Sequence, residues 1–193
     1  IAKQILRQHK IEIKSFVTQI GEERSESFSH SKISEILQKI KKQNDTVGAA
    51  MRVEIENLPV GIGDPYFRKL QSGLAQAMFS INALKGFEYG EGFRSASMKG
   101  SECNDVFIRK EDKIRCKTNH SGGIQGGISN GEKVYFNVAF KPIPTIMQTQ
   151  TTVDASGNAV EYNIEGRHDV CVVPRVIPIV EAMTAIVVAD FLV

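Results

Sequence analysis

The chain has 193 residues, of which 41% are hydrophobic and 24% are charged, the composition of an ordinary globular domain with a core. The formal net charge is only +2, which excludes the strongly basic surface of a general nucleic-acid binder. Three cysteines, Cys103, Cys116 and Cys171, lie far apart and form no C-x-x-C pair. This number and spacing argue against a disulfide framework or a zinc site, so we expect free thiols, no metal and a cytoplasmic protein.

The first third of the chain predicts a helix end, a strand, a loop, a helix and a second strand. Residues 1–6 have the pattern of a helix already in progress, and because the chain begins at Ile1 we expect a preceding segment to be missing from the sequence. Residues 11–20 alternate apolar and polar side chains early on, as a half-buried strand does, and residues 21–31 are polar like a surface loop. Residues 31–42 carry apolar side chains at helical spacing, and residues 51–56 alternate strictly, which predicts a strand.

A helix is expected over residues 65–81. Asp64 has the residue type of an N-cap, and Pro65 suits a first helical position. We expect the core face of this helix to carry Phe67, Leu70, Leu74, Met78 and Ile81. The small residues Ser72, Gly73 and Ala77 would allow another element to pack closely.

The remaining elements are a strand-like segment at 86–93, a polar and poorly legible stretch at 94–117, a glycine-rich loop at 118–131 and a clear strand at 133–140. We also expect a turn at 154–158 and a last helix over 173–193. The apolar stretch 170–193 is interrupted by charged residues and prolines, which favours a buried helix over a membrane span. Strands and helices follow one another in mixed order, so the predicted fold class is α+β.

Three loops carry candidate chemistry. Residues 122–127 match neither a dinucleotide fingerprint nor a P-loop, but their glycines permit a close backbone approach to a flat or anionic ligand, the alternative being a flexible hairpin loop. Lys141 and Thr145 flank two prolines and could clamp a phosphate, although a surface lysine after a strand has the same appearance. Arg167 could bind a phosphate or carboxylate, and Asp169 could transfer protons or cap the following helix. His120 and His168 are candidate acids or bases without an assigned role.

The order and content of these motifs resemble the chorismate synthase family. The similar segments are residues 61–65, 80–86, 118–131, 140–145, 167–171 and 176–183. The resemblance covers nearly the whole chain and thins at 22–44 and 94–116.

The resemblance implies a sandwich of β-sheet and α-helix, of which residues 1–193 are the C-terminal part of a single domain. It implies anti-1,4-elimination of phosphate from 5-enolpyruvylshikimate 3-phosphate to give chorismate, with reduced FMN (FMNH2) as cofactor, in a homotetramer that needs neither nucleic acid nor membrane. It assigns proton transfer to Asp169. It assigns cofactor binding to Asn82, Ala83, Gly126, Lys141, Pro142, Ile143, Pro144, Thr145 and Arg167.

One departure from the family pattern keeps an alternative open. The family's catalytic histidines and several of its phosphate-binding arginines belong to an N-terminal half that has no counterpart in this sequence. The alternative is a non-catalytic fragment that keeps the fold, the flavin contacts and the self-association surface. Whether the flavin is reduced intrinsically, with NADP as coenzyme, or by an external reductant also stays open.

Overall fold

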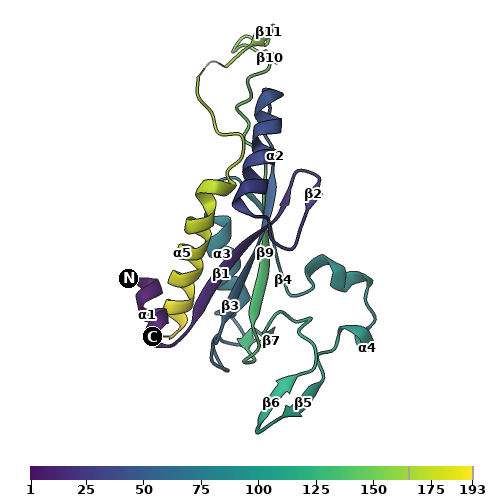
Figure 1. Cartoon of the computed structure of the whole chain (residues 1–193), viewed down its shortest axis with the longest axis vertical. Coiled ribbons are helices and arrows are strands. Elements are labelled where there is room, and N and C mark those ends of the chain that lie inside the picture. The colour runs from purple at the N-terminus through teal and green to yellow at the C-terminus, as the bar shows by residue number, and fades with distance from the viewer. Residues whose placement is uncertain (165, 193) are drawn as a thin grey trace.

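The computed structural model describes residues 1–164 and 166–192. Its centre is a five-stranded antiparallel sheet in the order β2-β1-β3-β9-β4. The strands are β1 (Glu12–Ile20), β2 (Glu23–Arg24), β3 (Ala49–Glu56), β4 (Leu84–Tyr89) and β9 (Val134–Phe140). Three helices, α1 (Ala2–Gln8), α3 (Leu70–Phe79) and α5 (Val173–Leu192), form a layer beside the sheet (Figure 1). This mixture of helices and strands confirms the α+β class.

Strict alternation in β3 decides which face of the sheet is buried. Ala49, Met51, Val53 and Ile55 are buried, whereas the residues between them are only half-buried. The buried set faces the helical layer because successive side chains of a strand point to opposite faces. The strands predicted at 11–20, 51–56 and 133–140 are therefore confirmed, with small shifts of their ends.

The last helix is anchored to two neighbouring elements by one carboxylate. Glu181 of α5 accepts a 2.6 Å hydrogen bond from Ser15 of β1 and pairs at 2.6 Å with Lys3 of α1. The buried stripe of α5 includes Val173, Val176 and Val180, as expected for an apolar helix packed on a sheet. No helix within the described residues has the length and apolar character required to cross a membrane.

The helix predicted at 31–42 is confirmed as α2 (His30–Lys42). The Ser29 hydroxyl accepts a hydrogen bond from the Lys32 N–H and caps its start. The loop expected at 21–31 is interrupted by the two-residue strand β2.

The helix predicted at 65–81 begins later than expected. α3 starts at Leu70, and its N-cap position is occupied by Lys69 rather than Asp64. The Leu70 N–H binds the carbonyl of Gly127 at 2.9 Å, so a distant segment fixes the start of this helix. Phe67 consequently lies outside the helix and is fully exposed, whereas the other four predicted core residues are buried.

The strand-like segment 86–93 is also shorter than predicted. β4 ends at Tyr89 because Gly90 and Gly92 adopt φ of 58° and 51°, values that divert an extended chain. A 3₁₀ helix, η1 (Gly92–Ser97), follows, and then the short helix α4 (Gly100–Cys103).

Three small hairpins complete the chain. β5 (Phe107–Lys110) pairs with β6 (Lys113–Cys116), and β10 (Gln150–Val153) pairs with β11 (Ala159–Tyr162) around the predicted turn at 154–158. The β5–β6 and β10–β11 hairpins project away from the central sheet, at opposite ends of the molecule (Figure 1). β7 (Ile124–Gln125) and β8 (Ile128–Ser129) lie within the glycine-rich loop.

Candidate active site

The segment after β9 lies against the turn between α3 and β4. The Lys141 N–H donates a 2.9 Å hydrogen bond to the carbonyl of Ala83, so these two predicted cofactor-binding residues are neighbours. Asn82, beside Ala83, is exposed. Pro142 and Pro144 fix their own φ angles and lack N–H groups. Residues 141–145, called here the 141–145 strap, are therefore a stiff connection beside the 82–83 turn.

A loop before β3 joins the strap to the segment that precedes α5. The Thr46 hydroxyl donates a 2.6 Å hydrogen bond to the carbonyl of Ile143. The next residue, Val47, donates its N–H to the carbonyl of Val170 at 2.9 Å. Asp169, the predicted catalytic residue, is thereby held at the same end of the sheet as the strap.

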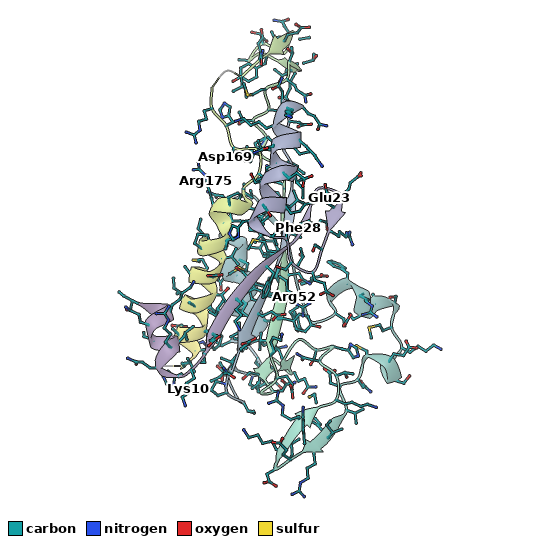
Figure 2. All side chains as sticks on the ribbon, in the orientation of Figure 1. Lys10, Glu23, Phe28, Arg52, Asp169 and Arg175 are labelled. Carbon is teal, nitrogen blue, oxygen red and sulfur yellow. The ribbon has the colours of Figure 1, made fainter. Side chains whose placement is uncertain are left out.

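Arg175, in the first turn of α5, grips the carboxylate of Asp169 with two nitrogens. Nε lies 2.8 Å from Oδ2, and Nη2 donates to Oδ1 at 3.2 Å (Figure 2). This bidentate pairing fixes the orientation of the carboxylate as well as its position. α5 begins at Val173, four positions after Asp169, so the alternative role of Asp169 as the cap of this helix is wrong. Sequence reasoning missed Arg175, because an arginine in a helix carries no motif of its own.

Two hollows meet at Asp169. One, of about 410 Å³, is lined by Asn82, Ala83, Asp169 and Arg175 together with apolar side chains of α5. The other, of about 700 Å³, is lined by Asp169 and Arg167 and by one side of α2. The structure therefore brings Asn82, Ala83, Asp169 and Arg167 to adjoining cavities.

Gly126 lies apart from this group. It is exposed at the tip of the β7–β8 hairpin, and the neighbouring Gly127 contacts the first residue of α3. Asn82 follows the last turn of α3, and a ten-residue helix is about 15 Å long. Gly126 and the 82–83 turn thus sit at opposite ends of α3 within this chain.

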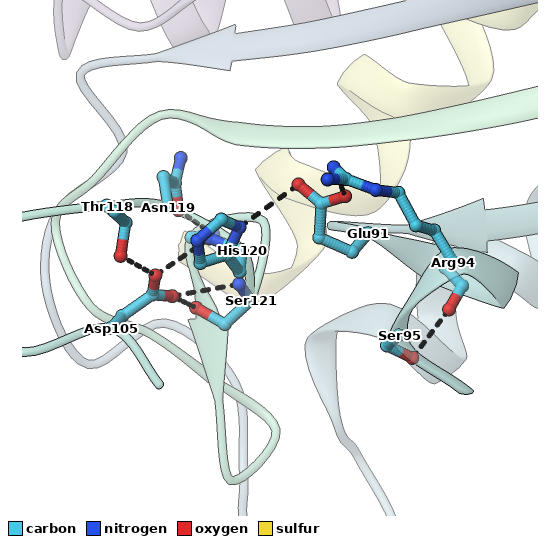
Figure 3. A network of polar contacts seen from close by, with 10 residues as sticks. Glu91, Arg94, Ser95, Asp105, Thr118, Asn119, His120 and Ser121 are labelled. Atoms are coloured by element: carbon cyan, nitrogen blue, oxygen red, sulfur yellow. Dashed lines mark hydrogen bonds and ion pairs between the residues drawn. The ribbon is translucent and has the colours of Figure 1, made fainter. Parts of the chain in front are cut away.

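A second polar network surrounds His120 (Figure 3). Nδ1 of His120 lies 3.1 Å from Oε1 of Glu91, whose other oxygen pairs with Arg94 at 2.6 Å. The hydrogen bond with His120, followed by that with Arg94, lowers the pKa of Glu91 against the opposing effect of burial. Glu91 is therefore ionised at neutral pH and fixes one nitrogen of the imidazole.

Asp105 holds the backbone on which His120 sits. Its carboxylate accepts hydrogen bonds from the His120 N–H at 2.8 Å, the Ser121 N–H at 2.8 Å, the Ser121 hydroxyl at 2.6 Å and the Thr118 hydroxyl at 2.7 Å. Burial alone would raise the pKa of Asp105, but these hydrogen bonds outweigh it and the pKa is lowered. Asp105 and Glu91 were not predicted from the sequence, where Asp105 lies in the polar stretch 94–117 and Glu91 in the glycine-containing segment 86–93.

Comparison with known proteins places this architecture in one family. The family model for chorismate synthase matches residues 1–193. The chain belongs to the chorismate synthase family. It is 44% identical to the chorismate synthase of Azobacteroides pseudotrichonymphae over 99% of this chain and 60% of that protein. It is 43% identical to that of Bacteroides thetaiotaomicron over 99% of this chain and 59% of the relative.

The fold agrees with a crystal structure of a chorismate synthase at a TM-score of 0.79 and 27% identity, covering 99% of this chain and 59% of that one. Both the architecture and the family expected from the motifs are thereby confirmed. The chain spans about 60% of the length of the first two relatives.

Proposed function

We propose that this chain supplies part of the active site of a chorismate synthase that converts 5-enolpyruvylshikimate 3-phosphate to chorismate by anti-1,4-elimination of phosphate, with reduced FMN as cofactor. The observation that carries the proposal is the meeting of the 141–145 strap, the 82–83 turn and Asp169 at one end of the sheet. Hydrogen bonds from Lys141 to Ala83 and from Val47 to Val170 hold these segments together.

The residues at this end of the sheet fit a flavin mononucleotide in charge and shape. Lys141 is exposed and carries an ammonium group suited to a phosphate, with the Thr145 hydroxyl on the same strap. The hollow beside Asn82 and Asp169 has apolar walls from Val176, Ile179 and Met183, which suit a flat ring system. The chemistry supplied by the reduced flavin is transient donation of electron density to the substrate, without net redox change.

The roles of the protein side chains follow from this placement. Lys141, Thr145 and Arg167 bind phosphate oxygens, and Asn82 and the strap backbone orient the ring. Asp169 would assist the transfer of the proton that leaves the substrate ring through its carboxylate oxygens, which Arg175 keeps in a fixed orientation. Gly126 is assigned to the cofactor by motif alone.

The same proposal extends to the biological setting. The protein acts in the shikimate pathway of aromatic amino acid biosynthesis, as a homotetramer in the cytoplasm.

The test is the substitution Asp169→Asn in the protein that carries this chain. It keeps the shape of the side chain but removes the carboxylate, so kcat for chorismate formation under anaerobic conditions with reduced FMN is expected to fall about 100-fold or more. Affinity for FMN is expected to change little. Asp190→Asn is the matched control, because Asp190 also pairs with an arginine, Arg68, at 3.0 Å, but lies near the other end of α5.

Unchanged turnover in Asp169→Asn would remove Asp169 from the mechanism. Absence of turnover in the unmodified protein, with flavin binding retained, would favour the non-catalytic alternative instead.

A further inference from the structure

A third hollow, of about 630 Å³, opens at the edge strand β4 and shares no lining residue with the two cavities around Asp169. Its walls come from the first turns of α3, from β4 and η1, and from the loop around His120. No role in the proposed reaction is assigned to any of these residues.

The backbone around this hollow is held in place by several specific constraints, although it contributes little to the hydrophobic core. η1 contributes no buried residue, and Phe93 within it is 86% exposed. The backbone is nevertheless closely specified, because Gly90 and Gly92 have positive φ and a Cβ at Gly90 would collide with the His120 carbonyl. The carboxylate of Asp105 fixes the opposite wall through its four hydrogen bonds. These constraints fix the backbone that frames the hollow.

One buried hydrogen-bond acceptor in the walls has no donor within the described part of the chain. Oε1 of Gln71 is buried and unpaired. Such a group costs stability unless a partner satisfies it. Nδ1 of His120 faces the Glu91 carboxylate, so Nε2 is the ring nitrogen that remains for a ligand. A ligand that supplies an N–H donor would satisfy the oxygen of Gln71.

The charged residues in the walls favour a positively charged ligand. No lysine or arginine is among the described residues that line the hollow, whereas Glu88 and Glu91 are. Glu91 is balanced by Arg94, but the carboxylate of Glu88 receives only neutral donors, the Asn137 amide at 3.1 Å and the Phe93 N–H at 3.1 Å. The potential in the hollow therefore favours a cation.

The rest of the wall is aromatic. Phe87, Tyr89 and Phe93 contribute rings, with Ala75 and Ile124 between elements. Aromatic faces attract both flat apolar groups and cations. The volume lies within the usual range for small-molecule sites, about 300–1,000 Å³.

We propose that this hollow is a binding site for a small aromatic amine, whose ring lies against Phe87, Tyr89 and Phe93 and whose ammonium group donates to Gln71. The site is independent of the proposed flavin chemistry, because it shares no residue with it.

The test is a calorimetric or NMR titration of the purified protein, as its cell produces it, with benzylamine and with benzyl alcohol. The two probes share the ring, but only benzylamine carries a positive charge. Benzylamine is expected to saturate at millimolar concentrations, with benzyl alcohol about tenfold weaker because a charge-assisted hydrogen bond becomes a neutral one. Equal affinity for the two probes, or no saturation by benzylamine up to about 10 mM, would overturn the proposal.

Variants locate the site. Gln71→Leu is expected to weaken benzylamine about tenfold while leaving the melting temperature equal or higher, because the variant removes an unpaired buried polar atom. Glu88→Gln is expected to weaken benzylamine but not benzyl alcohol. Gln76→Leu is the matched control on the same helix, where Gln76 is exposed and outside the hollow. Benzylamine binding that survives Gln71→Leu unchanged would place the probe elsewhere and refute the assignment.

Discussion

Lys141 is the residue on which the placement of the cofactor phosphate depends. Its N–H is committed to Ala83, but its exposed ammonium group remains available to an anion beside the 82–83 turn. A charge-assisted hydrogen bond contributes about 1.5–3 kcal/mol, so Lys141→Ala is expected to weaken FMN binding about 10- to 100-fold. Riboflavin has the same ring without the phosphate, and its affinity is expected to change hardly at all. Flavin titrations of both proteins, in the oxidised and reduced states, measure the difference.

Thr145→Val, which removes only a neutral donor, is expected to cost less than Lys141→Ala. Lys110→Ala serves as the control, because Lys110 is an exposed residue of the β5–β6 hairpin. Equal losses for FMN and riboflavin in Lys141→Ala would show that Lys141 supports the strap or touches the ring, and the phosphate assignment would be abandoned.

At the scale of elements, the close contact between α3 and α5 depends on Gly73, which has no side chain. Gly73 was expected to allow close packing, and a Cβ there would lie 2.8 Å from Cε2 of Phe191 and 3.4 Å from Cγ1 of Val187. Gly73→Ala improves helix propensity by about 1 kcal/mol, but overpacking costs about 1–3 kcal/mol. Gly73→Val adds more bulk and is β-branched, so it is expected to lower the melting temperature clearly. Thermal denaturation measures both melting temperatures, and that of Gly73→Val is expected to be the lower.

The double substitution Gly73→Ala with Phe191→Leu supplies the control, because leucine vacates the space that the ring occupies. Its destabilisation is expected to be smaller than the sum of the two single effects, as for residues in contact. Strict additivity would mean that the two helices already have room for a methyl group.

Elements with a clear hydrophobic period were predictable from the sequence, and elements fixed by distant partners were not. The alternation of β3 and the apolar spacing of α2 are local signals, so both elements were predicted within two residues. The start of α3 depends on the carbonyl of Gly127, which no local pattern around Asp64 reveals. The two projecting hairpins bury almost nothing, so their sequences carry little period, and only the turn at 154–158 was visible.

The candidate site shows the same division. The sequence pattern alone singled out the strap and Asp169, whereas the 82–83 turn was predicted only from the resemblance to a family, which also joined the three. The physical reason for their proximity is the strand order, which makes β4 and β9 neighbours although they lie far apart in the chain. The periodicity of the sequence does not reveal this strand order. It also does not reveal the ion pair between Arg175 and Asp169, which depends on where α5 begins.

Across the whole molecule, the face of the sheet turned away from the helices is held by charges rather than by a hydrophobic core. Arg52 lies over the ring of Tyr135, 3.9 Å from its centroid, and pairs with Glu54 at 3.0 Å. Lys133, just before β9, pairs with the other oxygen of Glu54 at 2.7 Å. Glu54 thus links two adjacent strands, and its side chain is only 13% exposed.

Glu54 makes the stability of the fold depend on acid pH. Burial alone would raise its pKa, but the hydrogen bonds and charges of Lys133 and then Arg52 lower it below its ordinary value of 4.5. A carboxyl group with a lowered folded-state pKa stabilises the fold above its unfolded pKa, and this stabilisation is lost as the pH falls through the folded pKa.

The melting temperature is therefore expected to fall more steeply below about pH 4.5 in the unmodified protein than in Glu54→Gln. Scanning calorimetry from about pH 6 to pH 3 measures both slopes, with Glu161→Gln, an exposed residue of β11, as the control. Because Asp105 and Glu91 also have lowered pKa values, some acid dependence persists in Glu54→Gln, and the decisive quantity is the difference between the two curves. Parallel curves for Glu54→Gln and the unmodified protein would show that the ion pairs on this face contribute nothing to folding.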